Sequence, residues 1–201
     1  WRPYDSGRDS ESVVRIWREV GWIDDSDPQA DAVRTFFSGG HGLVGPVDGG
    51  AECAVHWSEG SLRWLDDDVD LCAITAVTTG RVARRQRLGP DLLAEALAQG
   101  VESGAQVAAL GAFEQGYYDR FGFGTIGYEH TFNFDPATLT VPAPDATPVR
   151  ITHDDHADVF ELMNRRHRSH GGVTLAHPST MEAELAWMEN PWGLGYRDGD
   201  G

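Results

Sequence analysis

Residues 74–89 read Ile-Thr-Ala-Val-Thr-Thr-Gly-Arg-Val-Ala-Arg-Arg-Gln-Arg-Leu-Gly. The apolar, β-branched part of this stretch predicts a strand over residues 71–79 that ends at Gly80. The arginine-rich part predicts a loop, and the apolar spacing of residues 88–101 predicts an amphipathic helix after it. A loop that enters a helix N-terminus offers unpaired backbone N–H groups and the positive end of the helix dipole, and both suit a diphosphate.

The charge of this loop contrasts with the charge of the whole chain. The 201 residues contain 32 acidic and 16 basic side chains, which gives a formal net charge of −16, and every basic residue is Arg. Four of these 16 arginines lie within residues 81–87. Such a concentration of cations in an acidic protein favours a bound phosphate, and the alternative is a basic loop that contacts only solvent.

The composition excludes several classes of protein. Strong acidity works against a nucleic-acid partner, because phosphate backbones are bound by clustered cations. No apolar run reaches the roughly 18–20 residues that span a bilayer, so we expect no membrane partner. The first residues lack the layout of a signal peptide, which favours a cytoplasmic protein. Cys53 and Cys72 have no metal-ligand spacing, and we expect no metal site.

The excess of carboxylates has two interpretations. An acidic surface is typical of a halophilic protein from a high-salt cytoplasm, where salt screens the repulsion between carboxylates. A GC-rich coding sequence would also favour Arg over Lys. Neither interpretation bears on the reaction.

The helices and strands around residues 74–89 predict a mixed α/β domain. We expect two helices, an antiparallel meander, and then a strand-helix-strand-helix-strand succession. The expected helices cover residues 10–20, 29–38, 88–101 and 113–120. The expected strands cover residues 41–47, 51–58, 62–65, 71–79, 107–110 and 130–134, with hairpin turns at residues 48–50 and 59–60. Residues 107–110 are apolar throughout, which predicts a strand buried inside the sheet.

The second part of the chain repeats the opening pattern. Prolines at positions 142, 144 and 148 indicate a linker, after which residues 149–152 predict a strand and residues 154–168 a helix. We therefore predict a first domain over residues 1–136, a Pro-rich linker over residues 137–148, and the incomplete beginning of a second, similar domain over residues 149–201.

Five short motifs follow one another in a fixed order between residues 74 and 124. They are Ile74-Thr75-Ala76-Val77-Thr78, Arg84-Arg85, Ala108-Ala109-Leu110, Glu114, and Tyr118-Asp119-Arg120-Phe121-Gly122-Phe123-Gly124. In order and spacing they resemble the I-T-x-V-x-V, R-R-x-G, A-A-L, S-E and Y-x-R-F-G-Y-G motifs of the Eis-like (enhanced intracellular survival) acetyltransferases of the GNAT type. The resemblance covers residues 2–135, and residues 149–192 resemble the start of that family's second acetyltransferase-like domain.

This resemblance implies a GNAT fold and transfer of an acetyl group from acetyl-CoA to a primary amine, by direct attack in a ternary complex. The strand would splay from its neighbour, so that its backbone hydrogen-bonds the pantetheine arm of CoA at Val77, Thr78 and Thr79. The diphosphate would lie on the loop and helix start, at Arg84, Arg85, Arg87, Leu88 and Gly89.

Tyr118 matches the family's general acid. Its hydroxyl would protonate the leaving thiolate, while a strand N–H holds the oxyanion. Apart from the motif, a packed aromatic residue with a satisfied hydroxyl is the alternative, and Tyr117 is the neighbour that invites misassignment.

Three features depart from the family pattern. Arg87 replaces the loop glycine, where a side chain either obstructs the diphosphate or binds it directly. Phe113 replaces a serine and removes a polar group near the thioester. The family's general base is a C-terminal carboxylate of a later domain, so no base is assigned here.

The acceptor amine is not identified by the sequence. Acidic side chains attract cationic amines, and the candidates are Asp24, Asp25 and Asp27, with residues 66–68 as a second cluster. In so acidic a chain, both clusters are also consistent with plain surface, and Glu114 is better explained as ordering the turn beside Tyr118.

Two functions remain open. The first is the enzyme, with a small-molecule or peptide amine as acceptor and a homo-oligomer expected if later domains follow. The second is a degenerate CoA-binding or structural module without turnover, which the changes at Arg87 and Phe113 and the missing base favour.

Overall fold

The computed structural model describes residues 1–128, 130–140, 142, 147–188 and 192–196. The chain forms two compact units, one of residues 1–111 and 152–191 and one of residues 112–151 and 192–201. No helix in the described residues is both long and apolar enough to cross a membrane.

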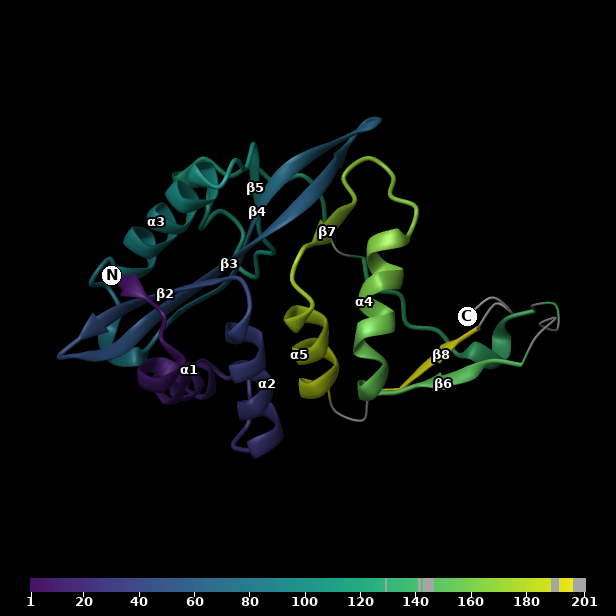
Figure 1. Ribbon diagram of the computed structural model, residues 1–201, viewed down its shortest axis with the longest axis horizontal. Helices are drawn as coiled ribbons and strands as arrows, with labels where there is room; N and C mark the ends of the chain where they lie inside the picture. Colours follow the sequence, from purple (N-terminus) through teal and green to yellow (C-terminus); the bar gives the residue numbers. More distant parts are fainter. Residues whose placement is uncertain (129, 141, 143–146, 189–191, 197–201) are drawn as a thin grey trace. The chain divides into compact units, whose positions relative to one another are not determined.

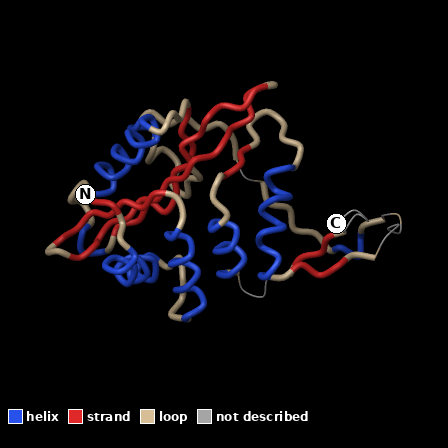
Figure 2. Tube along the Cα trace, in the orientation of Figure 1, coloured by secondary structure: helices blue, strands red, loops and turns tan. Residues whose placement is uncertain are grey.

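The first unit is built on a six-stranded mixed sheet. Its strand order is β1 (Arg2–Pro3), β2 (His41–Val47), β3 (Gly50–Trp64), β4 (Asp67–Thr79) and β5 (Val107–Ala109), and β7 (Val173–Leu175) pairs with the end of β3. All neighbours are antiparallel except β4 and β5, which are parallel. The two long strands β3 and β4 run side by side through the middle of this sheet (Figure 2).

Helices cover both faces of the sheet (Figure 1). The helices α1 (Ser6–Val20) and α2 (Asp27–Ser38) bury Val13, Trp17 and Phe36 against one face, together with Val44 and Ala54 of the strands. The helix α3 (Leu88–Glu102) covers the opposite face. A Cβ at its Gly100 would lie 2.6 Å from the sulfur of Cys72 on β4, so this glycine permits close packing of helix on sheet.

Residues 152–191 also contribute to the first unit. They form α4 (His156–Arg165), β7 and α5 (Ser179–Trp187). The ring of Trp187 lies 5.8 Å from Phe36 and 5.7 Å from Trp17, so α5 extends the aromatic core made by α1 and α2. The assignment of these residues to a second domain stays a prediction.

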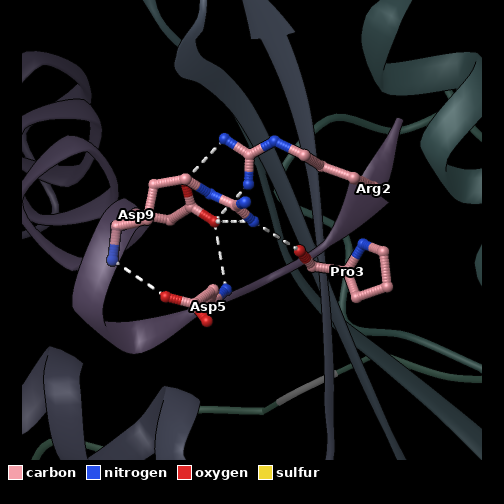
Figure 3. A network of polar contacts seen from close by, with 5 residues as sticks. Arg2, Pro3, Asp5 and Asp9 are labelled. Carbon is pink, nitrogen blue, oxygen red and sulfur yellow. Dashed lines mark hydrogen bonds and ion pairs between the residues drawn. The ribbon is translucent and has the colours of Figure 1, made fainter.

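The start of the chain is fixed by a buried carboxylate on α1 (Figure 3). The Asp9 side chain is 1% exposed, and it accepts hydrogen bonds from the guanidinium of Arg2 (2.7 Å to Oδ1), from Arg8 and from the Asp5 N–H (3.0 Å). Burial opposes ionisation of Asp9, but these hydrogen bonds outweigh it and lower the pKa. Asp5 itself caps α1 by accepting the Arg8 N–H at 3.0 Å.

The second unit contains little regular structure in its described residues. Its strands β6 (Val149–Ile151) and β8 (Gly193–Gly195) form an antiparallel pair. Short 3-10 turns cover Asp119–Phe121 and Pro136–Thr138.

Most expected elements of the first unit are confirmed. The strand over residues 41–47 has the expected bounds, and α1, α2, β4 and α3 occur where the periodicity places them. The hairpin at residues 59–60 is wrong, because β3 runs without a break from Gly50 to Trp64. The strand at residues 107–110 lies at the end of the strand order and is half-buried, so its expected position inside the sheet is also wrong.

Two expectations fail in the second unit. The helix over residues 113–120 is reduced to the 3-10 turn Asp119–Phe121, preceded by turns and bends. Residues 130–134 form no strand, although their apolar residues alternate. Phe132 is 82% exposed and Phe134 62% exposed, so no neighbouring element in the described chain covers the apolar face that the alternation predicted.

Candidate active site

The pairing of the sheet is interrupted between β4 and β5. These parallel strands pair only through Leu71–Ala73 and Val107–Ala109. β4 continues through residues 74–79, and no other described strand pairs with this edge. The backbone groups on the edge are therefore available to a ligand that adds to the sheet as a strand would.

A β-bulge lies in the same part of β4. Ala54 and His56 of β3 are two residues apart, whereas their partners on β4, Thr78 and Thr75, are three apart. Ala76, between those partners, has a left-handed φ of 54°. The extra residue of a bulge is left outside the ladder, and this bulge lies in the part of β4 that extends past its pairing with β5.

The side chains of the strand residues are engaged within the sheet. Thr78 is buried and its hydroxyl donates to the Ala76 carbonyl at 3.3 Å, and the Thr79 hydroxyl lies 3.3 Å from the sulfur of Cys53. Val77 is half-buried. The backbone of β4 is therefore the part that this strand offers to a ligand.

The loop between β4 and α3 concentrates positive charge at a helix start. Arg84, Arg85 and Arg87 are exposed, and none of them has an ion-pair partner among the described residues. The first main-chain bond into α3 is donated by Asp91 to the Arg87 carbonyl at 3.1 Å, which leaves the N–H groups of Leu88 and Gly89 ahead of the helical ladder. Cations beside unpaired N–H groups of a helix start are the groups that bind anions in proteins.

Arg87 has the backbone conformation of a glycine. Its φ is 66° and ψ is 8°, and it occupies the N-cap position of α3. A left-handed φ favours glycine, the residue that the Eis-like motif has at this position. In this chain the same conformation is adopted by a residue with a guanidinium.

Tyr118 belongs to the second unit, whereas β4 and the arginine loop belong to the first. It precedes the 3-10 turn Asp119–Phe121, and its ring contacts those of Tyr117 (4.9 Å between centroids) and Phe123 (6.0 Å). Its hydroxyl makes no hydrogen bond within the described residues. Partial burial, with the nearby Tyr117 and Glu114, raises the pKa of the Tyr118 phenol. The phenol is therefore protonated at neutral pH, as a general acid must be.

Three of the expected acceptor carboxylates, Asp24, Asp25 and Asp68, have structural partners. Asp24 accepts the Ser26 N–H at 2.7 Å, and hydrogen bonds from Ser26 lower its pKa. Asp25 lies 3.5 Å from the Arg18 guanidinium, and Asp27 is exposed at the first position of α2. In the second cluster, Asp68 pairs with Arg168 at 2.6 Å. All remain on the surface, and their role in acceptor binding stays a prediction.

His56 lies on β3 at the β-bulge, but it does not suit the role of a general base. It is 1% exposed between the rings of Phe36 (4.6 Å) and Phe37 (5.5 Å), and its Nε2 hydrogen-bonds the Gly39 carbonyl at 2.6 Å. Burial lowers the pKa of His56 to about 4, so its imidazole is neutral. Its burial excludes the contact with substrate or solvent that proton transfer needs.

Sequence reasoning overlooked one residue near the loop. Glu19 of α1 accepts a hydrogen bond from the backbone N–H of Arg81 at 3.0 Å. The i, i+4 spacing of Arg15 and Glu19 is visible in the sequence, but the contact of Glu19 with the loop depends on how α1 packs on the sheet.

The first unit thus combines a mixed sheet, whose parallel strands β4 and β5 pair over three residues only, with a basic helix start. A family model described as acetyltransferase (GNAT) domain matches residues 8–126, more than half of the chain. The chain therefore belongs to the GNAT acetyltransferase family and carries an acetyltransferase domain of that type. None of the curated proteins compared with the sequence matches it.

Solved structures share the fold. A GCN5-related N-acetyltransferase from Kribbella flavida is 20% identical with a TM-score of 0.69, over 94% of this chain and 50% of that one. Eis1 from Mycobacterium abscessus is 18% identical with a TM-score of 0.65, over 87% of this chain and 44% of its own. The GNAT family N-acetyltransferase YhbS from Escherichia coli, solved in complex with CoA, is 22% identical with a TM-score of 0.50, over 61% of this chain and 67% of that one. The chain thus spans half or less of the first two proteins.

The role of Arg87 can be tested by restoring the family's residue. We expect Arg87→Gly to weaken acetyl-CoA binding about tenfold, because a charge-assisted hydrogen bond is lost while the left-handed backbone is kept. Calorimetric titration at constant salt measures the Kd, and thermal unfolding verifies that the fold is intact. Tighter binding by the variant would show that the Arg87 side chain obstructs the diphosphate.

Proposed function

We propose that this protein transfers the acetyl group of acetyl-CoA to the primary amine of a small molecule or peptide, by direct attack in a ternary complex. One observation supports this most strongly: three arginines without ion-pair partners in the described chain stand at the start of α3, next to a strand edge without a partner. In a protein of net charge −16, an anion is the natural partner of that loop.

Each part of the site has a task in this proposal. Arg84, Arg85 and Arg87, with the N–H groups of residues 88–89, hold the diphosphate. The open edge of residues 77–79 hydrogen-bonds the pantetheine arm, and a strand N–H holds the oxyanion.

The proton balance of the reaction assigns the role of Tyr118. The amine nitrogen forms a bond to the thioester carbon as the carbon–sulfur bond breaks, and the sulfur leaves as a thiolate. The Tyr118 hydroxyl gives its proton to that sulfur, and the acetylated nitrogen loses one to solvent or to a base that we do not assign.

We also place the protein with the Eis-like members of the family. The order and spacing of five motifs between residues 74 and 124 support this, and the fold shared with Eis1 is consistent with it. By the same resemblance, residues 149–201 begin a second acetyltransferase-like domain, and a homo-oligomer is expected if later domains follow.

A CoA-binding module without turnover is the second candidate. The replacement of the loop glycine by Arg87 and the absence of an assigned base favour it. The module would bind acetyl-CoA through the same loop and strand edge, so binding alone does not distinguish the two.

Titration with acetyl-CoA at high salt, paired with a thiol-release assay on a panel of amines, tests the proposal. We expect a Kd between about 1 μM and 1 mM, the usual range for a substrate, and amine-dependent release of CoA. Binding without release by any amine would favour the module. A folded sample that binds no acetyl-CoA would overturn both candidates.

A further inference from the structure

A network of three charged side chains joins α1 to the sheet beside the arginine loop. The Arg15 guanidinium donates to Glu19 Oε1 and to Glu52 Oε1, each at 2.6 Å, and to the Ala51 carbonyl at 3.1 Å. Arg15 and Glu19 lie one turn apart on α1, and Glu52 lies on β3. The guanidinium therefore holds both carboxylates in place from two different elements.

The same network fixes the start of the loop. The N–H of Gly80 donates to the Glu52 carbonyl oxygen at 2.7 Å, and the N–H of Arg81 donates to Glu19 Oε2 at 3.0 Å. Two successive backbone groups are thus held, one by the sheet and one by a side chain of α1. The hydrogen bond from Arg81, followed by that from Arg15, lowers the pKa of Glu19, so its carboxylate is ionised at neutral pH.

Position 80 requires a glycine because there is no room for a side chain. Its φ is −55°, a conformation open to any residue, but a Cβ at this position would lie 2.4 Å from Glu52 Oε2. That oxygen is buried and has no hydrogen-bond partner in the described chain. The carboxylate of Glu52 thus packs directly against the backbone where β4 ends and the loop begins.

We propose that Glu19 is a positioning residue for the diphosphate site: through its bond to the Arg81 N–H, and held by Arg15, it sets the path of residues 81–89. This inference rests on the proposed binding of acetyl-CoA by that loop. Glu19 contacts no reacting atom. Its effect is to limit the conformations of the loop, so that the arginines and the N–H groups of residues 88–89 face one anion together.

Electrostatics and positioning predict opposite effects of removing Glu19. A carboxylate near the loop repels a diphosphate, so its removal strengthens anion binding if charge alone matters. Removal weakens binding if Glu19 organises the loop. Glu19→Gln separates the two, because it removes the charge while its one amide oxygen can still accept the Arg81 N–H; its NH2 group cannot accept from Arg15, so that contact is lost.

The experiment compares acetyl-CoA with acetyl-pantetheine, which lacks the diphosphate. For Glu19→Ala we expect the KM of acetyl-CoA and the Kd of CoA to rise about tenfold, the size of one hydrogen bond to a charged group. The kcat with acetyl-CoA and the kcat/KM for acetyl-pantetheine should stay within about twofold. Glu19→Gln keeps an acceptor for the Arg81 N–H but loses the contact with Arg15, so its KM for acetyl-CoA should lie between those of the wild type and Glu19→Ala, whereas charge alone predicts a KM below that of the wild type. Glu11→Ala is the matched control, because Glu11 is an exposed α1 carboxylate paired with Arg34 at 2.8 Å.

The outcomes separate this inference from the proposed function. If the wild type binds neither CoA nor acetyl-CoA, the proposed function is wrong and the inference falls with it. If the wild type prefers acetyl-CoA over acetyl-pantetheine and Glu19→Ala keeps that preference or strengthens it, only the positioning role is wrong. Should Glu19→Ala not fold, Gly80→Ala replaces it, since its Cβ displaces Glu52 and is expected to weaken CoA binding by a similar factor.

Discussion

The Tyr118→Phe variant should lose about 10²–10⁴-fold in kcat, the range that general-acid catalysis contributes, while the Kd of acetyl-CoA stays unchanged. The variant removes one hydroxyl that has no hydrogen-bond partner in the described chain, and it keeps the ring contacts with Tyr117 and Phe123. A stopped thiol-release assay at saturating amine measures kcat, and calorimetric titration measures binding.

Tyr117→Phe is the matched control for this prediction, because the two tyrosines are adjacent and their rings are 4.9 Å apart. We expect it to retain most of the wild-type kcat. The raised pKa of Tyr118 also predicts that the loss of activity caused by its ionisation has its midpoint above the ordinary tyrosine value of about 10. An active Tyr118→Phe variant, or an inactive Tyr117→Phe variant, would contradict the assignment.

The second large effect concerns stability. Asp9→Asn should lower the free energy of unfolding at pH 7 by about 3 kcal/mol, because it removes a buried charge that pairs with Arg2 and Arg8. Urea unfolding measures the change. Asp31→Asn is the control: Asp31 is 73% exposed in its pair with Arg34, and we expect it to cost less than about 1 kcal/mol.

The pH dependence gives an independent check on Asp9. Its pKa is lower in the folded state than the unfolded value of about 3.9, so its ionisation stabilises the fold fully above that pH. This contribution is lost as the pH falls below about 4 toward the folded-state pKa. The difference in stability between wild type and Asp9→Asn should therefore shrink between pH 5 and pH 2, roughly the range over which a paired Asp titrates. A difference that is constant with pH would contradict the pairing.

The first unit was largely predictable because its signals are local. The β-branched run before Gly80 and the apolar periodicity of residues 88–101 each specify one element, and the structure places β4 and α3 there. The hairpin turn predicted at Gly60 is wrong, because the glycine serves a contact with a strand far away in the sequence. A Cβ on Gly60 would lie 2.4 Å from the carbonyl oxygen of Thr174, so this glycine allows β7 to approach.

The candidate site was predictable only in part. The arginine loop follows from charge and helix position, whereas the role of Tyr118 came from a motif and not from its surroundings. The contact of Glu19 with Arg81 spans 62 residues and depends on the packing of α1, so no local pattern contains it. The strand expected at residues 130–134 failed because alternation specifies a face but supplies no partner.

The open edge of β4 has a consequence for the behaviour of the protein in solution. An unpaired strand is a template on which a second molecule can build, and it is the usual starting point of edge-to-edge aggregation. A net charge of −16 opposes such encounters by mutual repulsion. The net negative charge thus helps to keep unpaired the strand edge that the proposed binding of acetyl-CoA requires.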